Sequence, residues 1–146
     1  IDIQHHKIEQ TFADLYVAPR GDNQNSGLTP EQPLKTISFA LLKAASDSVS
    51  PDTIHLASGT YSLSGGEHFP LSLKRDVSIK GTSRDSVILD AENEIFLLRG
   101  IYQATDYTIS NITIQNGNGE INSPFHLGGF KFYRNYRTSF TKIGRA

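Results

Sequence analysis

Short β-prone runs, each followed by glycine, asparagine or aspartate, fill the sequence from residue 53 onward and limit its possible folds more than any other feature. Apolar and polar residues alternate or nearly alternate in each run, which is typical of strands with one buried face. The runs span residues 53–57, 71–73, 77–80, 87–89, 95–98, 107–110, 112–115 and 130–133. Strands this short cannot bury a face alone, so we expect them to stack on one another.

Four of these runs resemble one another, at residues 77–81, 96–100, 112–117 and 130–135. Their starts lie about 16 to 19 residues apart, which predicts a structural repeat of that length. A β-sandwich would need longer strands joined by tight hairpins, and a doubly wound α/β fold would need a helix between successive strands. The pattern favours a mainly β protein built as a parallel β-helix, which uses two or three short strands per coil.

One helix is predicted ahead of these runs, after a short strand at residues 15–18. Thr36 is a suitable N-cap, and apolar residues recur every three or four positions in a helix of about ten residues that ends before Pro51. The end of a stack of strands exposes backbone and apolar side chains, so we interpret this helix as an N-terminal α-helical cap. The predicted organisation is a lead-in segment (1–13), the cap and first coils (14–135) and a basic tail (136–146), which is non-native or truncated.

The composition excludes several classes of protein. A chain of 146 residues suits one domain with a core of its own. The absence of cysteine excludes a disulfide scaffold, a cysteine-ligated zinc site and a redox thiol. No apolar stretch approaches the roughly 20 residues of a membrane-spanning helix. Because the chain begins at Ile1 and contains no methionine, we expect it to be a piece of a longer protein, truncated on its C-terminal side.

Charge is unevenly distributed along the chain. Residues 1–130 carry 9 basic and 15 acidic side chains, a net charge of −6, whereas residues 131–146 carry five basic side chains and no acidic one. An acidic body is a poor partner for nucleic acid. Only the tail, where aromatic residues lie between the basic ones, has a composition that suits contact with phosphates and bases. We interpret the tail instead as a last strand with a truncated terminus, and expect no nucleic-acid partner.

Five blocks of sequence, taken in order, resemble the opening of a domain of unknown function that begins many pectin-lyase-like right-handed parallel β-helix proteins. The blocks are residues 15–19, 21–29, 32–37 with Ala40, 52–56 and 59–61. The resemblance covers about residues 14–119. It implies a right-handed, single-stranded parallel β-helix in a secreted or cell-surface protein of bacteria or archaea. Some proteins that open in this way are polysaccharide lyases or glycoside hydrolases, whose catalytic base and calcium-binding acids usually sit on later coils.

The loop at residues 21–27 is a candidate calcium site. Asp22, Asn23 and Asn25 place one carboxylate and two amide oxygens close together, and calcium binds six to eight oxygen ligands. The alternative is that these side chains bond to the local backbone and hold the turn. Calcium binding is the one cofactor hypothesis that the sequence offers.

Candidate catalytic side chains form two groups. Asp90, Glu92 and Glu94 alternate, so an extended segment would point all three to one side, where two carboxylates can flank a glycosidic bond. Lys80 and Arg99 follow the apolar residues of corresponding runs, and we expect them to align on one outer face that neutralises an acidic polysaccharide. For both groups the alternative is ordinary solvated side chains. The histidines have no metal-like spacing, and His55 is expected to face outward.

These patterns lead to two functional hypotheses. The first is that the chain is the N-terminal capping and scaffold portion of a secreted or cell-surface β-helix protein, contacts polysaccharide, and packs its last coil against the rest of the parent chain. The alternative is a carbohydrate-active enzyme, a polysaccharide lyase or glycoside hydrolase, with its active site mostly downstream.

Overall fold

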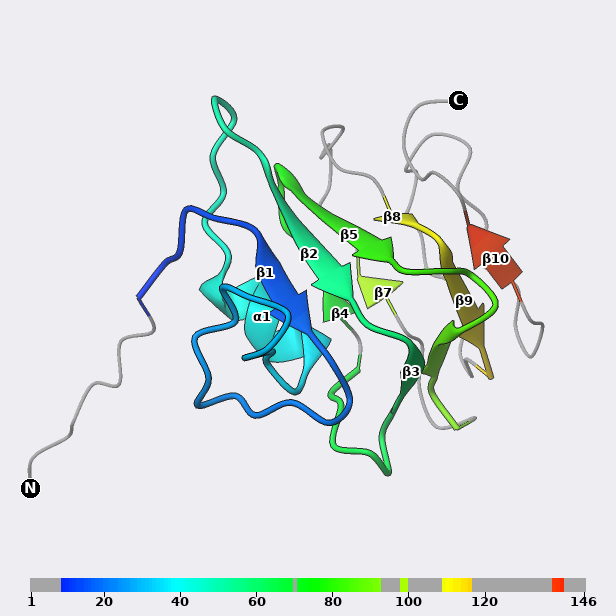
Figure 1. Cartoon of the computed structure of the whole chain (residues 1–146). Coiled ribbons are helices and arrows are strands. Elements are labelled where there is room, and N and C mark those ends of the chain that lie inside the picture. The colour runs from blue at the N-terminus through cyan, green and yellow to red at the C-terminus, as the bar shows by residue number, and fades with distance from the viewer. Residues whose placement is uncertain (1–8, 70, 93–97, 100–108, 117–137, 141–146) are drawn as a thin grey trace, which may run out of the picture.

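The computed structural model describes residues 9–69, 71–92, 98–99, 109–116 and 138–140. Within these ranges the protein is mainly β, with parallel sheets and one short helix (Figure 1). The elements are β1 (Leu15–Val17), α1 (Ile37–Lys43), β2 (Asp52–Leu56), β3 (Gly59–Ser62), β4 (Leu71–Ser72), β5 (Val77–Gly81), β6 (Val87–Asp90), β7 (Leu98–Arg99), β8 (Ile109–Ser110), β9 (Ile112–Gln115) and β10 (Thr138–Phe140). No helix in the described ranges is long and apolar enough to cross a membrane.

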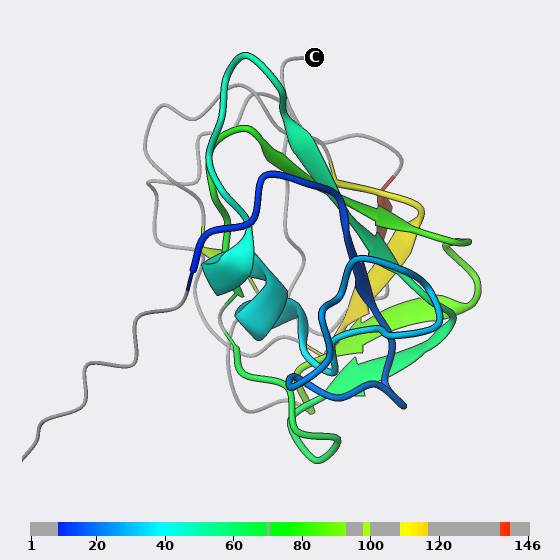
Figure 2. The same ribbon diagram turned by 60° about the vertical axis from the view of Figure 1, so that its left-hand side comes forward.

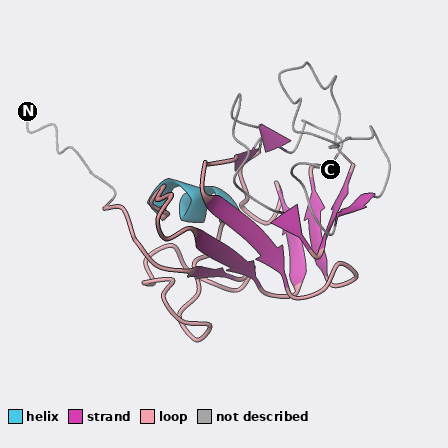
Figure 3. Cartoon of the chain, turned by 90° about the horizontal axis from the view of Figure 1, so that it is seen from above, coloured by secondary structure: helices cyan, strands magenta, loops and turns pink. Residues whose placement is uncertain are grey.

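From β2 to β9 the chain visits three sheets in a fixed cyclic order. The first sheet has the strand order β1-β2-β5-β8, the second β10-β9-β6-β3, and the third pairs β4 with β7. Every pair is parallel except β9 with β10. Viewed from above, the strands of neighbouring passes lie side by side (Figure 3). Each strand from β2 to β6 therefore pairs with the strand that occupies its place in the next pass of the chain.

The register of these pairs corrects the repeat length predicted from the sequence. Ile54 pairs with Ile79, and Ile79 pairs with Ile109, so one full pass of the chain is longer than the predicted repeat. Three of the similar runs that suggested the shorter repeat contain β5, β7 and β9, which belong to three different sheets. The fourth, at residues 130–135, lies outside the described residues. Each step between the described similar runs therefore joins strands of different sheets and skips one sheet, whereas a full pass requires a strand in each of the three.

Aligned apolar side chains form the core between the sheets. At matched positions of the first sheet, Leu15, Ile54, Ile79 and Ile109 are each no more than 1% exposed. Burying one such side chain stabilises the fold by roughly 1.5–3 kcal/mol. The burial of β2 alternates residue by residue, as its sequence predicted.

Helix α1 is shorter than predicted, because Ala44 adopts an extended conformation and ends it after Lys43. Thr36 is its N-cap, as predicted, and accepts a hydrogen bond from the backbone N–H of Phe39 at 3.2 Å. The helix contacts β1, β2 and β4, and so lies at the β1 end of the strands (Figure 2). Two strands were not predicted: β3, and β10 in the segment expected to be a tail.

Candidate functional site

One row of outward-facing residues crosses the first sheet. Tyr16 of β1 pairs in register with His55 of β2, which pairs with Lys80 of β5, which pairs with Ser110 of β8. Their chain neighbours on either side point into the core in β1 and β2, because side chains alternate along a strand. Adjacent strands are about 4.8 Å apart, so the four residues form a continuous row, which we call the outer ladder.

The first two residues of the outer ladder form a stacked pair. The rings of Tyr16 and His55 have centroids 5.0 Å apart and planes inclined by 18°. His55 is also held by Asp14, whose Oδ2 lies 2.9 Å from Nε2, while Oδ1 accepts the N–H of Thr53 at 2.9 Å. The stack is therefore held in place by the protein.

The charge state of Asp14 determines the direction of this hydrogen bond. Partial burial raises the pKa of Asp14, but the hydrogen bonds from His55 and from the backbone of Thr53, with the nearby imidazole charge, outweigh burial and hold the pKa below its ordinary value. At neutral pH the carboxylate is ionised and can only accept, so His55 Nε2 donates. In the neutral imidazole, Nδ1 then has a lone pair that can accept a further hydrogen bond.

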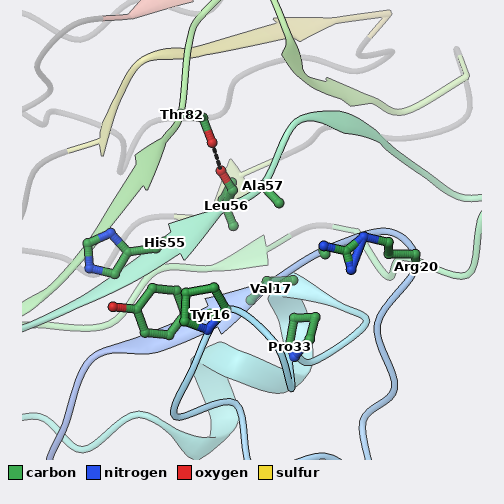
Figure 4. Close-up of a pocket in the computed structure, with 10 residues that line it drawn as sticks. Tyr16, Val17, Arg20, Pro33, His55, Leu56, Ala57 and Thr82 are labelled. Atoms are coloured by element: carbon green, nitrogen blue, oxygen red, sulfur yellow. Dashed lines mark hydrogen bonds between the residues drawn. The ribbon is translucent and has the colours of Figure 1, made fainter.

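A hollow of about 240 Å³ lies beside the stacked pair (Figure 4). Tyr16 and His55 stand on one side and Arg20 on the opposite side, with Val17 and Pro33 between them. The complete lining is Tyr16, Val17, Ala18, Arg20, Pro30, Pro33, His55, Leu56, Ala57 and Thr82. The hollow thus combines an aromatic wall, apolar surface and one cationic side chain.

The polar groups of the hollow differ in how far they are already bonded. The carbonyl of Leu56 accepts the hydroxyl of Thr82 at 2.8 Å, and the carbonyl of Ala57 accepts the hydroxyl of Tyr61 at 2.8 Å. Arg20, in contrast, forms no salt bridge with any acidic side chain of the described ranges, and it is exposed. Its guanidinium is therefore available to an anion from outside the chain.

The predicted calcium loop uses its polar side chains to hold its own backbone. Asn23 Oδ1 accepts the N–H groups of Lys35 at 2.9 Å and Thr36 at 3.1 Å. Asn25 Nδ2 donates to the carbonyl of Pro33 at 2.9 Å, and Asp22 Oδ1 accepts the N–H of residue 24 at 2.9 Å. Among the described residues no group of three histidine, cysteine or acidic side chains is arranged to hold a metal ion. This geometry agrees with the alternative interpretation of the loop.

The predicted acidic cluster does not form one extended face. Strand β6 ends at Asp90, and Glu92 has a φ of 54°, so the chain turns between them. Asp90 accepts the side-chain amide of Gln115 at 2.8 Å and that of Asn116 at 3.1 Å. Glu92 accepts the backbone N–H of Ser64 at 2.9 Å and also its hydroxyl.

Both carboxylates are stabilised in the ionised form. Burial raises the pKa of Asp90, but hydrogen bonds from Gln115, from the N–H of Glu92 and from Asn116 lower it below its ordinary value. The side-chain and backbone hydrogen bonds of Ser64 lower the pKa of Glu92. The hydrogen bonds of Asp90 and Glu92 connect successive passes of the chain. A carboxylic acid with a lowered pKa is also a poor proton donor at neutral pH. Glu94, the third member of the cluster, lies outside the described residues.

The predicted alignment of Lys80 and Arg99 is wrong. Lys80 lies in β5 of the first sheet, where it is exposed, whereas Arg99 lies in β7 of the two-stranded sheet and pairs with Ser72. Lys80 is instead adjacent to His55 in the outer ladder. The outward position expected for His55 is confirmed by its alternation with two buried neighbours.

Sequence reasoning did not single out Tyr16 or Arg20 as site residues. Tyr16 and His55 are far apart in the sequence, and only the parallel register brings them together. One signal was present in the sequence: both lie between two aliphatic residues, in Leu-Tyr-Val and Ile-His-Leu. When two strands each carry a ring-bearing residue between two buried aliphatic residues, the two rings point to the same face of the sheet. Such strands are candidates for adjacent, paired strands.

Comparison with known proteins identifies the family but no characterised relative. No curated protein and no solved structure matches the chain significantly. The family described as "Protein of unknown function (DUF1565)" matches residues 19–96, more than half of the chain, and this segment includes Arg20, His55 and Thr82 of the hollow. The chain therefore belongs to the DUF1565 family of proteins of unknown function.

Proposed function

We propose that the chain is the N-terminal cap and first coils of a right-handed parallel β-helix, and that it serves as a scaffold in contact with polysaccharide. The observation that carries this proposal is the strand register. Strands β2 to β9 return to the same three sheets in the same order, with partners such as Ile54 and Ile79 that lie one full pass of the chain apart. A β-helix coil has this cyclic order, and a parallel crossover is right-handed in almost all proteins.

The arrangement around β1 supports the capping role. One edge of β1 pairs with β2, and the other is covered by the loop that leads to α1. The N–H of Tyr16 donates to the carbonyl of Gly27 at 2.7 Å, and its carbonyl accepts the N–H of Leu34 at 2.8 Å. An uncovered edge would present unpaired backbone groups to other chains. The loop and α1 together close this end of the strands.

The outer ladder and its hollow support the polysaccharide contact. Tyr16 and His55 present aromatic surface, Lys80 and Arg20 present exposed positive charge, and all four belong to a face that the core does not use. Sugars offer C–H faces that pack on aromatic rings and hydroxyl groups that need polar partners. We also propose a secreted or cell-surface location, on the basis of the sequence resemblance to β-helix proteins of that kind.

Catalysis by this chain is not part of the proposal. Asp90 and Glu92, the described members of the predicted acid pair, are bonded to neighbouring passes. A scaffold that binds polysaccharide needs neither of them as a reacting group.

Affinity electrophoresis tests the polysaccharide contact. The purified chain is run in native gels with and without dissolved polysaccharide, using polygalacturonate, carrageenan and neutral hydroxyethylcellulose in separate gels. We expect slower migration in at least one of the polysaccharide gels relative to a marker protein that does not bind glycans. Unchanged migration in all three would contradict the proposed contact.

A further inference from the structure

We propose that the hollow between the Tyr16–His55 stack and Arg20 is a subsite for one anionic sugar residue, a pyranose ring that carries a carboxylate or sulfate group. This inference rests on the proposed polysaccharide contact and assigns it to particular atoms. The Tyr16–His55 pair would provide the apolar contact for the sugar ring, and the guanidinium of Arg20 would bind its charged substituent (Figure 4).

The aromatic wall is held in one arrangement before a ligand binds. The two rings are nearly parallel, with an angle of 18° between their planes, and the hydrogen bond to Asp14 holds the imidazole at 2.9 Å. A ligand that packs on them does not have to order either ring first, and a fixed site loses less side-chain freedom on binding. Val17, Pro33 and Ala57 add apolar surface to the same hollow.

Arg20 supplies the selectivity for an anion. It lies across the hollow from the stack with its guanidinium turned inward, and it forms no salt bridge within the described part of the chain. A guanidinium has a planar set of donors that fits the two oxygens of a carboxylate or sulfate, which a point charge such as lysine does not match. A neutral sugar would leave this group without a charged partner.

Two further groups are placed to accept or donate hydrogen bonds to sugar hydroxyls. Nδ1 of His55 has no hydrogen-bond partner among the described residues, because the bond to Asp14 uses Nε2. The hydroxyl of Thr82 donates to the carbonyl of Leu56 at 2.8 Å, which leaves its oxygen able to accept. The rim of the hollow thus offers polar contacts as well as the apolar face and the cation.

The size of the hollow limits the ligand to about one sugar residue. Pockets that enclose drug-sized ligands occupy roughly 300–1,000 Å³, and this one occupies about 240 Å³. The outer ladder continues from His55 to Lys80, which is exposed on the adjacent strand. A chain held by one residue in the hollow would place its next anionic residue near this second cation.

The test compares variants in the same affinity gels and measures dissociation constants from the dependence of migration on polysaccharide concentration. Loss of a hydrogen-bonded charge pair predicts that Arg20→Ala weakens binding to polygalacturonate or carrageenan roughly tenfold or more. Arg20→Lys should recover part of the affinity. Tyr16→Ala should weaken binding several-fold, whereas Tyr16→Phe, which keeps the ring, should not. Arg75→Ala is the matched control, because Arg75 is also exposed and lies outside the hollow.

The outcomes separate this inference from the function on which it rests. Binding of the wild-type chain that persists unchanged in both Arg20→Ala and Tyr16→Ala would overturn the subsite and leave the polysaccharide contact standing. An equal loss in Arg75→Ala, or equal binding of hydroxyethylcellulose and the anionic polymers, would also overturn it. Absence of binding in all gels would overturn both proposals. The difference between the polygalacturonate and carrageenan gels identifies the substituent as carboxylate or sulfate.

Discussion

Replacing Glu67 with alanine should destabilise the fold by about 2–4 kcal/mol. Glu67 is only 4% exposed, and its carboxylate accepts hydrogen bonds from backbone N–H groups in the first turn of α1. Oε2 accepts the N–H of Ile37 at 2.7 Å, and Oε1 accepts the N–H of Ser38 at 3.0 Å. Since Thr36 already caps the next N–H, that of Phe39, the first turn of the helix has its three leading donors satisfied.

The magnitude follows from what the substitution leaves without a partner. A buried N–H group deprived of its acceptor costs about 1–3 kcal/mol, and bonds to an ionised acceptor lie at the upper end. The bond to Ile37 is fully buried, whereas that to Ser38 is partly buried, so water can replace part of the second. Glu67→Gln keeps one oxygen acceptor but no charge, and should cost roughly half as much as alanine.

Urea unfolding followed by far-UV circular dichroism at pH 7 measures both changes. Glu31→Ala is the control, because Glu31 is exposed and should change the free energy of unfolding by less than about 0.5 kcal/mol. If Glu67→Ala costs no more than the Glu31 control, the carboxylate does not cap α1 and the reasoning is refuted.

Three further substitutions test other contacts. Asp52→Asn should raise the free energy of unfolding at pH 7 by about 1 kcal/mol. Burial and the charge of Asp14 raise the pKa of Asp52, and its Oδ2 has no hydrogen-bond partner among the described residues. The gain should vanish in urea titrations at pH 3, where the wild-type carboxyl is protonated. The pKa of Asp90 is lowered, so its contribution is present above pH ~4 and lost as the pH falls through the lowered value. Asp90→Asn should therefore flatten the loss of stability in acid, and an unchanged pH profile would contradict this. Gly81→Ala should lower the melting temperature by several degrees, because a Cβ would overlap a carbonyl oxygen of the turn between β8 and β9; an unchanged melting temperature would exclude that crowding.

Local features of the fold were predictable because they depend on neighbouring residues. The alternation in β2 and the N-cap at Thr36 both follow from a few adjacent side chains. The repeat length was not predictable in this way. Every strand that faces the core needs the same apolar spacing and the same turn residues, whichever sheet it joins, so similar runs do not reveal which strands are partners. Strand β3 was missed because Tyr61 is its one buried side chain, which gives no alternation.

The candidate site depended still more on pairing between distant strands. Asp90 and Glu92 attracted attention because acids close in sequence suggest chemistry, but they hydrogen-bond to Gln115 and Ser64 in other passes of the chain. The Tyr16 and His55 rings come from different strands, and neither run alone indicates that they stack. An interpretation of the sequence that aligned strands by pass of the chain would have placed these two residues side by side.

The hydrogen-bond pattern explains why the outer ladder, and not the turns, is the better candidate for recognition. Carboxylates and amides at the turns are already bonded within the fold: Asp90 accepts a hydrogen bond from the next pass of the chain, and Asn23 bonds to the backbone of its own loop. A ligand that used them would have to break those bonds and weaken the stack of strands. Arg20 and Lys80 are exposed and form no salt bridge within the described part of the chain, so binding through them costs the fold nothing. In a structure of stacked strands, binding groups that leave stability intact must therefore be sought on outward-facing positions of the sheets.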